Sequence, residues 1–154
     1  MTEGREATKE LAPNSLIGFL DYYLGTKAPI QIPDRGKEWL VKYGPWVLIV
    51  SVVLMLQAAL LMLGLGAVLV PFAGVGYATG FGILGFGLLV EFGLTAAALP
   101  GLFARKMYGW RLLFYSEVVS GVTRLLGGYI LGAVVVGVFG MWVLFQVRPL
   151  YKAS

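Results

Sequence analysis

Four long apolar stretches dominate the chain between Trp46 and Val147, and short breaks of glycine, proline or charge separate them. Each stretch is long enough for a helix that crosses a membrane, because about 20 apolar residues span a bilayer. The pattern therefore predicts an all-α polytopic membrane protein whose four transmembrane helices form two hairpins. The predicted crossings are about 46–70, 81–99, 110–126 and 129–147.

The breaks between the stretches predict where the helices begin and end. Gly44-Pro45 precedes the first crossing, and proline suits the first position of a helix because its missing N–H costs nothing there. We expect Pro71 to end the first crossing, Pro100-Gly101 to end the second, and Gly127-Gly128 to form a tight turn. The third stretch has about 17 residues, the lower limit for a crossing. In an alternative layout it is re-entrant, and the C-terminus lies on the outer side.

The residues before the bundle predict a cytoplasmic and interfacial segment, 1–44. Residues 1–12 read as a polar tail, and a short amphipathic helix from Leu16 to Leu24 follows, with Asn14 or Ser15 as its N-cap. This helix lies either in the membrane interface or on the protein's own cytoplasmic face. An extended linker over 28–33, a second amphipathic piece over 34–43, the bundle over 45–148 and a cytoplasmic tail over 149–154 complete the predicted organisation.

Positive charge is distributed asymmetrically around these stretches. Eleven of the twelve Lys and Arg residues fall in segments that share one side of the predicted membrane, and Arg124 lies inside a stretch. Cytoplasmic loops collect Lys and Arg, so both termini are predicted to be cytoplasmic. The eleven are Arg5, Lys9, Lys27, Arg35, Lys37, Lys42, Arg105, Lys106, Arg111, Arg148 and Lys152.

Composition narrows the function classes. The chain is 58% hydrophobic, and it has neither cysteine nor histidine, so thiol chemistry and the commonest metal and haem ligand are absent. We therefore predict no enzyme activity, no metal and no cofactor. The net charge of +4 arises from basic residues that flank apolar spans, which favours a lipid membrane over nucleic acid as the partner.

Polar residues inside the predicted crossings are the candidate site. Charged groups at that depth are costly unless they are paired or protonated. One interpretation is structural, with the two acids sharing the arginine, and the other is a site that binds a cation or carries a proton. The candidates for this polar network or ion site are Glu91, Glu117, Arg124 and Gln57.

Glycines and aromatic residues predict packing and membrane anchoring. Small residues let helices approach closely, and Trp and Tyr favour the membrane boundary. Glu91 shares a helix face with Gly80, Gly87, Thr95 and Ala98, and small residues on the opposite face suggest that the second crossing is central. The predicted packing glycines are Gly82, Gly85, Gly93, Gly128, Gly132 and Gly137. The predicted interface anchors are Trp39, Tyr43, Trp46 and Trp110.

Three segments resemble a group of small bacterial four-helix membrane proteins. They are the stretch from Pro100 to Tyr115, the end from Leu144 to Tyr151, and the N-terminal pattern from Leu20 to Pro29. The resemblance implies a bacterial membrane location and four helices. Members are usually uncharacterised and are sometimes labelled chromate transporters, and no catalytic residue carries over to this chain.

Residues 1–44 carry six of the twelve basic residues and are not needed to make four crossings, which suggests docking onto a partner or onto anionic lipid. We therefore expect a non-catalytic accessory subunit of a larger bacterial membrane complex, by analogy with photosynthetic and respiratory assemblies. The alternative is a small homo-oligomeric ion or solute transporter that uses Glu91, Glu117 and Arg124.

Overall fold

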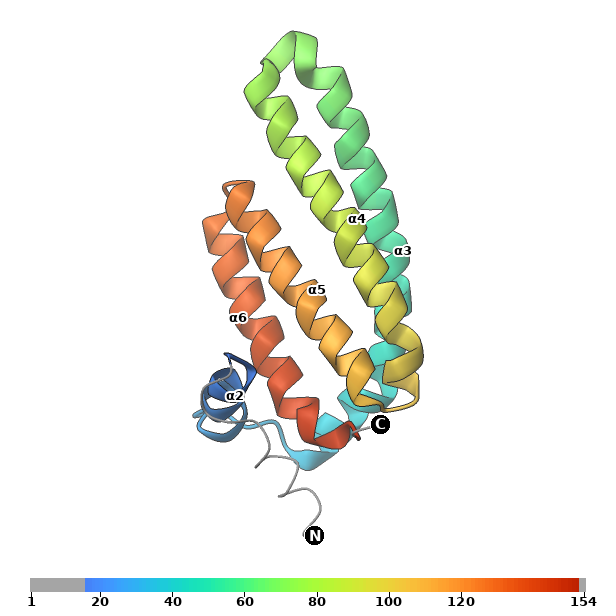
Figure 1. The fold of residues 1–154 in the computed structure, drawn as a ribbon, viewed down its shortest axis with the longest axis vertical. Helices are drawn as coiled ribbons and strands as arrows, with labels where there is room; N and C mark the ends of the chain where they lie inside the picture. Colours follow the sequence, from blue (N-terminus) through green and yellow to red (C-terminus); the bar gives the residue numbers. More distant parts are fainter. Residues whose placement is uncertain (1–15, 153–154) are drawn as a thin grey trace.

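The computed structural model describes residues 16–152, whose backbone is helical over most of its length (Figure 1). Within this range there is no strand, and one isolated bridge pairs Lys106 with Lys152. The polar tail and the N-cap predicted at Asn14 or Ser15 lie outside the described residues. The elements are α2 (Leu16–Leu20), the π-helical η1 (Asp21–Thr26), α3 (Asp34–Ala73), α4 (Val75–Phe103), α5 (Met107–Leu126), α6 (Ile130–Val147) and the 3₁₀ turn η2 (Arg148–Leu150).

The four long helices run side by side with alternating direction (Figure 1). Gly74 separates α3 from α4, and a short turn over residues 127–129 separates α5 from α6. Gly74 and Gly128 both have a φ of +82°, a left-handed conformation that glycine adopts without strain. Because α4 packs on both α3 and α5, the second apolar stretch is the central helix, as its two small-residue faces predicted.

Three helices are long and apolar enough to cross a membrane, which indicates a membrane protein. They are Asp34–Phe72, Thr79–Phe103 and Ile130–Leu150. The remaining long helix, α5, is not among them, and it carries Arg111, Glu117 and Arg124.

The helix start predicted at Pro45 is wrong, because α3, 40 residues long, begins at Asp34 and continues through Gly44-Pro45. Proline inside a helix removes one backbone hydrogen bond and costs about 3 kcal/mol. Pro45 and Val41, whose carbonyl loses that bond, are both buried, so packing at this end of α3 offsets the cost. Pro71 and Pro100 also lie inside helices, which end at Ala73 and Phe103, three and four residues later than the predicted crossings.

The two pairs of helices differ in length. From the rise per residue, α4 is ~43 Å long and α5 and α6 are ~30 Å and ~27 Å. A side-chain carbon of Leu84 on α4 lies 2.8 Å from the position of a Cβ on Gly127, at the far end of α5. Residues 75–83 of α4 therefore extend ~13 Å beyond α5. We call this projecting end of α3 and α4, residues 64–83, the tip.

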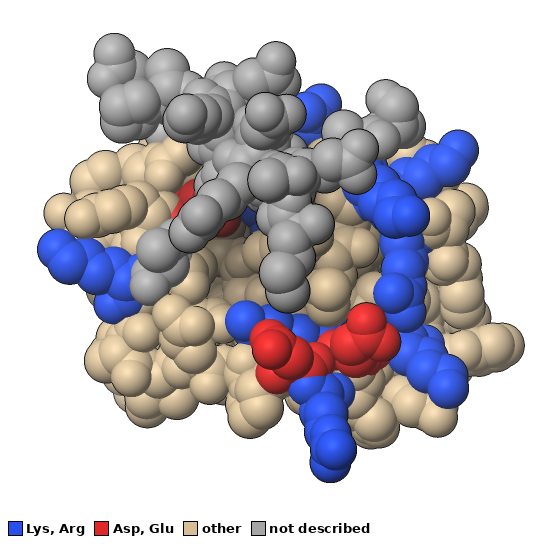
Figure 2. Space-filling model, turned by 90° about the horizontal axis from the view of Figure 1, so that it is seen from below, with Lys and Arg blue, Asp and Glu red and all other residues tan. Residues whose placement is uncertain are grey.

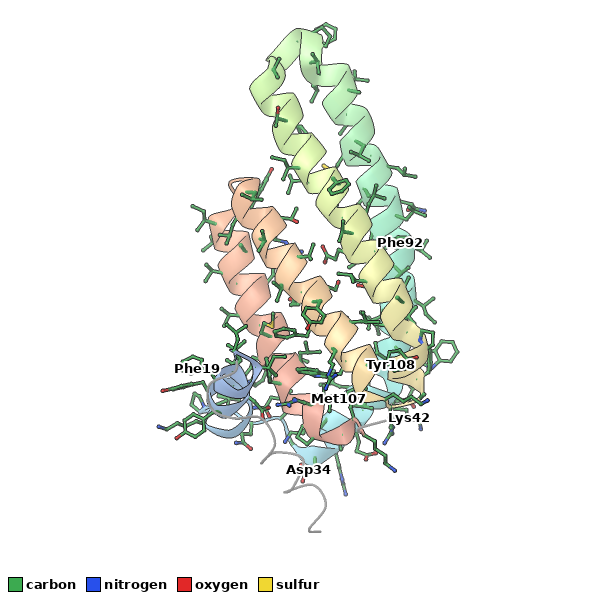
Figure 3. The ribbon with its side chains drawn as sticks, viewed as in Figure 1. Phe19, Asp34, Lys42, Phe92, Met107 and Tyr108 are labelled. Atoms are coloured by element: carbon green, nitrogen blue, oxygen red, sulfur yellow. The ribbon has the colours of Figure 1, made fainter. Side chains whose placement is uncertain are left out.

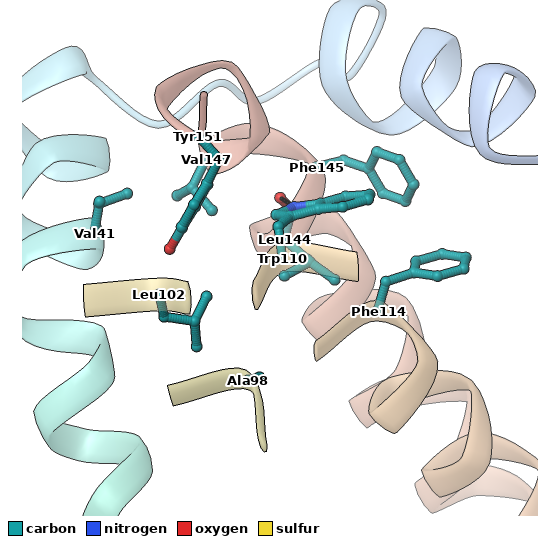
Figure 4. Close-up of a cluster of buried hydrophobic side chains, with 9 residues drawn as sticks. All are labelled: Val41, Ala98, Leu102, Trp110, Phe114, Leu144, Phe145, Val147 and Tyr151. Carbon is teal, nitrogen blue, oxygen red and sulfur yellow. Dashed lines mark hydrogen bonds between the residues drawn. The ribbon is translucent and has the colours of Figure 1, made fainter. Parts of the chain in front are cut away.

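The main hydrophobic core lies at the opposite end of the molecule, which we call the basal end. Trp110 is at its centre, with ring centroids 5.7 Å from Phe114 and 5.3 Å from Phe145. We call this group of residues the basal core (Figure 4). Its members are Val41, Ala98, Leu102, Trp110, Phe114, Leu144, Phe145, Val147 and Tyr151.

The C-terminal residues are tied to the turn between α4 and α5. The N–H of Met107 donates to the carbonyl of Lys152 at 2.9 Å, and the N–H of Lys152 donates to the carbonyl of Arg105 at 2.9 Å. These bonds hold residue 152 and the 105–107 turn at one end of the molecule. The alternative layout would instead separate residue 152 from this turn.

Candidate intramembrane polar site and its surroundings

A stripe of buried polar side chains lies between α4 and α5. Glu91 is 6% exposed, and Thr95 and Ser116 are also buried. A hydrogen bond of 2.8 Å joins Thr95 Oγ1 to Ser116 Oγ, and the Ser116 hydroxyl also donates to the backbone carbonyl of Glu91 at 3.3 Å. The face that the sequence predicted for Glu91 therefore points towards α5.

Glu117 of α5 faces the next helix. Its carboxylate lies directly against Gly140 of α6, where any side-chain carbon would collide with it. Arg124 interacts electrostatically with both Glu91 and Glu117, and the two carboxyl groups also act on each other. The structure thus brings together three of the four predicted site residues. Gln57 does not join them, because its side chain is exposed on α3.

Two buried polar atoms of this cluster have no hydrogen-bond partner among the described residues. They are Ser120 Oγ and Arg124 Nη1. Ser120 is 2% exposed and lies beside the carboxyl of Glu91, although it forms no hydrogen bond of good geometry with it. A buried donor without a partner costs about 1–3 kcal/mol. A further polar group that bonds to both atoms would remove this cost.

Close helix contacts occur at glycines that differ from the predicted set. Of the six predicted packing glycines, Gly85 is in tight contact, with Leu63 of α3. Gly132 has an ordinary contact, and no described atom lies within 4 Å of a Cβ position on Gly82, Gly93, Gly128 or Gly137. The predicted packing role is therefore supported at Gly85, and the other five have no tight neighbour within the described chain.

The tight glycine contacts between α4 and α5 occur at residues that are not among the six predicted packing glycines. Gly87 lies against Thr123, and the backbones of Gly101 and Gly109 touch where α4 and α5 cross. Gly87 could have been found, because it shares the face of Glu91. Gly101 and Gly109 flank the turn between α4 and α5. The sequence pattern predicts Gly101 at the end of the second crossing and Gly109 in the loop before the third.

The N-terminal helix is docked on the basal end of α6. The Asp21 carboxylate lies 2.8 Å from Arg148 Nη1, and the Gln146 side-chain amide donates to the carbonyl of Leu24 at 3.1 Å. Ile17, Leu20 and Leu24 pack against the basal core. This favours docking on the protein's own face over a helix that lies free in the interface.

The opposite face of α2 and η1 remains uncovered. Phe19, at the side of the basal end in Figure 3, is 56% exposed, and Tyr22 and Tyr23 are half exposed. Lys27 Nζ lies 5.5 Å from the Tyr22 ring centroid. One face of the segment therefore packs on the protein, and the other presents aromatic rings beside the apolar surface of α6.

Three of the four predicted interface anchors are exposed at the basal end. Trp39, Tyr43 and Trp46 present their rings outward, and the Trp39 and Tyr43 centroids are 5.3 Å apart. Trp110 differs, because it is 1% exposed and belongs to the basal core. Its indole N–H donates to the Leu144 carbonyl at 2.8 Å. This N–H, which an interface anchor would direct to the membrane boundary, is therefore bonded inside the protein.

The basal end carries most of the positive charge of the described chain. Figure 2 shows Lys and Arg side chains around this face, with a few acidic groups between them. Lys42 lies at this end, whereas Phe92 lies far along α4 (Figure 3). The basic residues of these segments are Lys27, Arg35, Lys37, Lys42, Arg105, Lys106, Arg111, Arg148 and Lys152.

An open apolar groove of about 530 Å³ lies between α4 and α5 towards the tip. Ile83, Phe86 and Val90 line it from α4, and Val119 and Leu126 line it from α5. Gly82 forms part of the α4 wall and leaves that side shallow. One end of the groove therefore lies where α5 ends beside the longer helix α4.

No protein-family model, curated protein or solved structure matches this chain. The similarity to small bacterial four-helix membrane proteins therefore stays a prediction.

Proposed function

We propose that this chain is a non-catalytic accessory subunit of a larger bacterial membrane protein complex. In this proposal it crosses the inner membrane four times, with both termini and the turn between α4 and α5 in the cytoplasm. The observation that carries the proposal is the mismatch in hydrophobic length between its two helix pairs.

The positive charge at the basal end supports the orientation. Nine of the ten Lys and Arg residues in the described chain belong to segments at this end, and Arg124 lies away from it. Loops rich in Lys and Arg stay on the cytoplasmic side because their translocation is unfavourable. The exposed rings of Trp39, Tyr43 and Trp46 mark the same boundary.

The burial of charges on α5 supports a fourth crossing despite its lower hydropathy. Glu117 is turned towards α6, and Arg124 lies near Glu91 of α4. Charged side chains in a membrane are tolerated where they face other helices rather than lipid. Arg111 is one turn from the start of α5 and reaches the cytoplasmic boundary.

No single tilt fits both helix pairs to one bilayer. The apolar part of α3 is ~37 Å long, whereas that of α5 is ~25 Å, and a hydrocarbon core is about 30 Å thick. A tilt that shortens the longer pair also shortens the shorter pair. The longer pair therefore projects beyond the shorter pair at the tip and leaves an apolar surface of α4 uncovered next to the groove. A helix of a neighbouring subunit would cover this surface and fill the groove.

The surface of α3 supports the same conclusion. Only 11% of its apolar span is buried within the chain, because it packs mainly on α4. Its exposed large residues run along its whole length and include Val47, Val50, Val53, Leu54, Leu60, Leu61 and Val68. Such a surface suits a helix that packs against other subunits as well as lipid.

Extraction in a mild detergent followed by native mass spectrometry tests the proposal. The expected result is a complex with larger membrane subunits in a fixed ratio. Gly82→Leu fills the groove and is expected to release these subunits, because no described atom lies within 4 Å of its Cβ position and the fold itself is undisturbed. The matched control Gly137→Leu, on an open site of α6, is expected to leave the ratio unchanged.

Two outcomes would contradict the proposal. A chain that is recovered only as a homo-oligomer would favour the transporter alternative built on Glu91, Glu117 and Arg124. Retention of the same subunits by Gly82→Leu, in the same ratio, would remove the groove from the interface.

A further inference from the structure

The buried cluster of α4 and α5 carries an uncompensated negative charge. Glu91, Glu117 and Arg124 are the charged groups of the cluster. Within the described residues, α6 carries no charged side chain, α3 carries none after Lys42, and the other charged residue of α5, Arg111, is exposed near the start of that helix. With both acids ionised and the arginine protonated, the net charge of the cluster is −1.

Burial makes that charge unfavourable. Glu91 is 6% exposed, and Glu117 is pressed against Gly140. A lone carboxylate in a low-dielectric interior is expelled, paired or protonated. Arg124 can balance one carboxylate, so the second needs another positive charge.

The two atoms without partners identify where a ligand fits. Ser120 and Arg124 are four residues apart on α5, so their side chains lie on one face of the helix. Ser120 Oγ and Arg124 Nη1 are both buried and unbonded, and Ser120 lies beside the Glu91 carboxyl. These observations are independent of the charge count, and they point to the same place.

We propose that this cluster is an intramembrane proton-binding site, in which Glu91 and Glu117 share one proton and a water molecule links them to Ser120 and Arg124. The proton brings the cluster to neutrality without a metal ion. The water accepts a hydrogen bond from Arg124 Nη1, and its remaining bonds go to Ser120 and the carboxyl pair. Two to four polar partners are what a buried water requires. This site is independent of the subunit role proposed above.

Infrared spectroscopy of the full-length protein in lipid nanodiscs at neutral pH tests the site. The carbonyl stretch of a protonated carboxylic acid is distinct from that of a carboxylate. The expected wild-type signal corresponds to one buried carboxylic acid per chain. Glu91→Gln and Glu117→Gln are each expected to abolish it, because the remaining carboxylate is then balanced by Arg124.

Two further variants separate a shared proton from a merely structural cluster. Arg124→Gln is expected to double the signal, since both acids must then be protonated. Ser120→Ala removes one partner of the water and is expected to shift the band without reducing its area. Ser120→Ala changes one hydroxyl, so it also provides a folded variant if a charge substitution fails to insert.

The proposal is overturned if the wild type shows no buried carboxylic acid. It is also overturned if either glutamine variant keeps the full signal, because the proton would then belong to a single residue. Loss of the wild-type band on adding sodium at constant pH would replace the proton with a metal cation and likewise refute it.

Discussion

The Asp21 carboxylate lies 2.8 Å from Nη1 of Arg148, and this ion pair joins η1 to the end of α6. Both side chains are largely buried, at 18% and 12% exposure. The Arg148 guanidinium also lies 5.2 Å from the centroid of the Trp110 ring, so the pair connects the N-terminal segment to the centre of the basal core.

Asp21→Asn is expected to loosen this docking. A hydrogen bond to a charged group contributes about 1.5–3 kcal/mol, and the substitution removes the charge while it keeps the shape. Limited proteolysis in detergent should therefore cut the linker over residues 28–33 at least several-fold faster than in the wild type. Lys37→Gln serves as a control, because it disrupts a longer pair, 3.8 Å, whose carboxylate partner Asp34 is fully exposed. Equal cleavage rates in Asp21→Asn and the wild type would show that the pair does not hold the segment.

Gly109→Ala is expected to destabilise the bundle. A Cβ at this position would lie 2.5 Å from the backbone nitrogen of Leu102 and 2.6 Å from the carbonyl carbon of Gly101. Backbone cannot move aside as a side chain can, so the cost is expected to reach about 1–3 kcal/mol or more. Thermal unfolding in detergent measures the loss.

The matched control for that substitution is Gly137→Ala. Its Cβ would meet no described atom within 4 Å, and alanine raises helix propensity by about 1 kcal/mol relative to glycine. Its unfolding temperature should equal or exceed that of the wild type. If both variants lose stability equally, the tight crossing of α4 and α5 does not exist.

Alkaline pH is expected to weaken the basal core through Tyr151. Burial raises the pKa of its phenol above the ordinary value of 10.0, and the Arg105 guanidinium opposes this only in part. The folded protein therefore holds the phenolic proton more tightly than the unfolded chain. The contribution of Tyr151 to stability is complete below about pH 10 and falls as the pH rises through the raised pKa.

Tyr151→Phe isolates this effect. The variant keeps the ring but cannot ionise, so the stability difference between wild type and variant should move in favour of the variant above about pH 10. Unfolding followed by tryptophan fluorescence from about pH 8 to about pH 11 measures the difference. A difference that stays constant over this range would show that the phenol is not buried in the folded protein.

The apolar pattern of the sequence predicted much of the architecture. The apolar stretches located α4, α5 and α6 to within a few residues, apart from the extra turns at each end of α4. The helical wheel placed Glu91 on the face that meets α5. These features depend on hydrophobic periodicity, which is local and therefore readable from the chain.

Details that depend on packing between helices could not be predicted in this way. Proline at position 45 is typical of a helix start, and its place inside α3, in a buried part of the basal end, could not be read from the chain. Trp110 has the residue type and the position in the sequence of an interface anchor. In the structure it lies in the core, where it donates to the Leu144 carbonyl and packs on the rings of Phe114 and Phe145. Which glycines touch a neighbour also depends on helix rotation and register, so Gly109 could not be separated from Gly82 and Gly93.

The most direct test of the account is the side of the membrane on which each end of the bundle lies. The chain has no cysteine, so single-cysteine variants can be labelled without background. Lys106→Cys, Lys152→Cys and Gly76→Cys should be treated with a membrane-impermeant thiol reagent, in intact cells and in inside-out vesicles. We expect Gly76→Cys to be labelled in cells, whereas the other two should be labelled only in inside-out vesicles. Labelling of Lys152→Cys in intact cells would contradict the four-crossing topology and the cytoplasmic basal end.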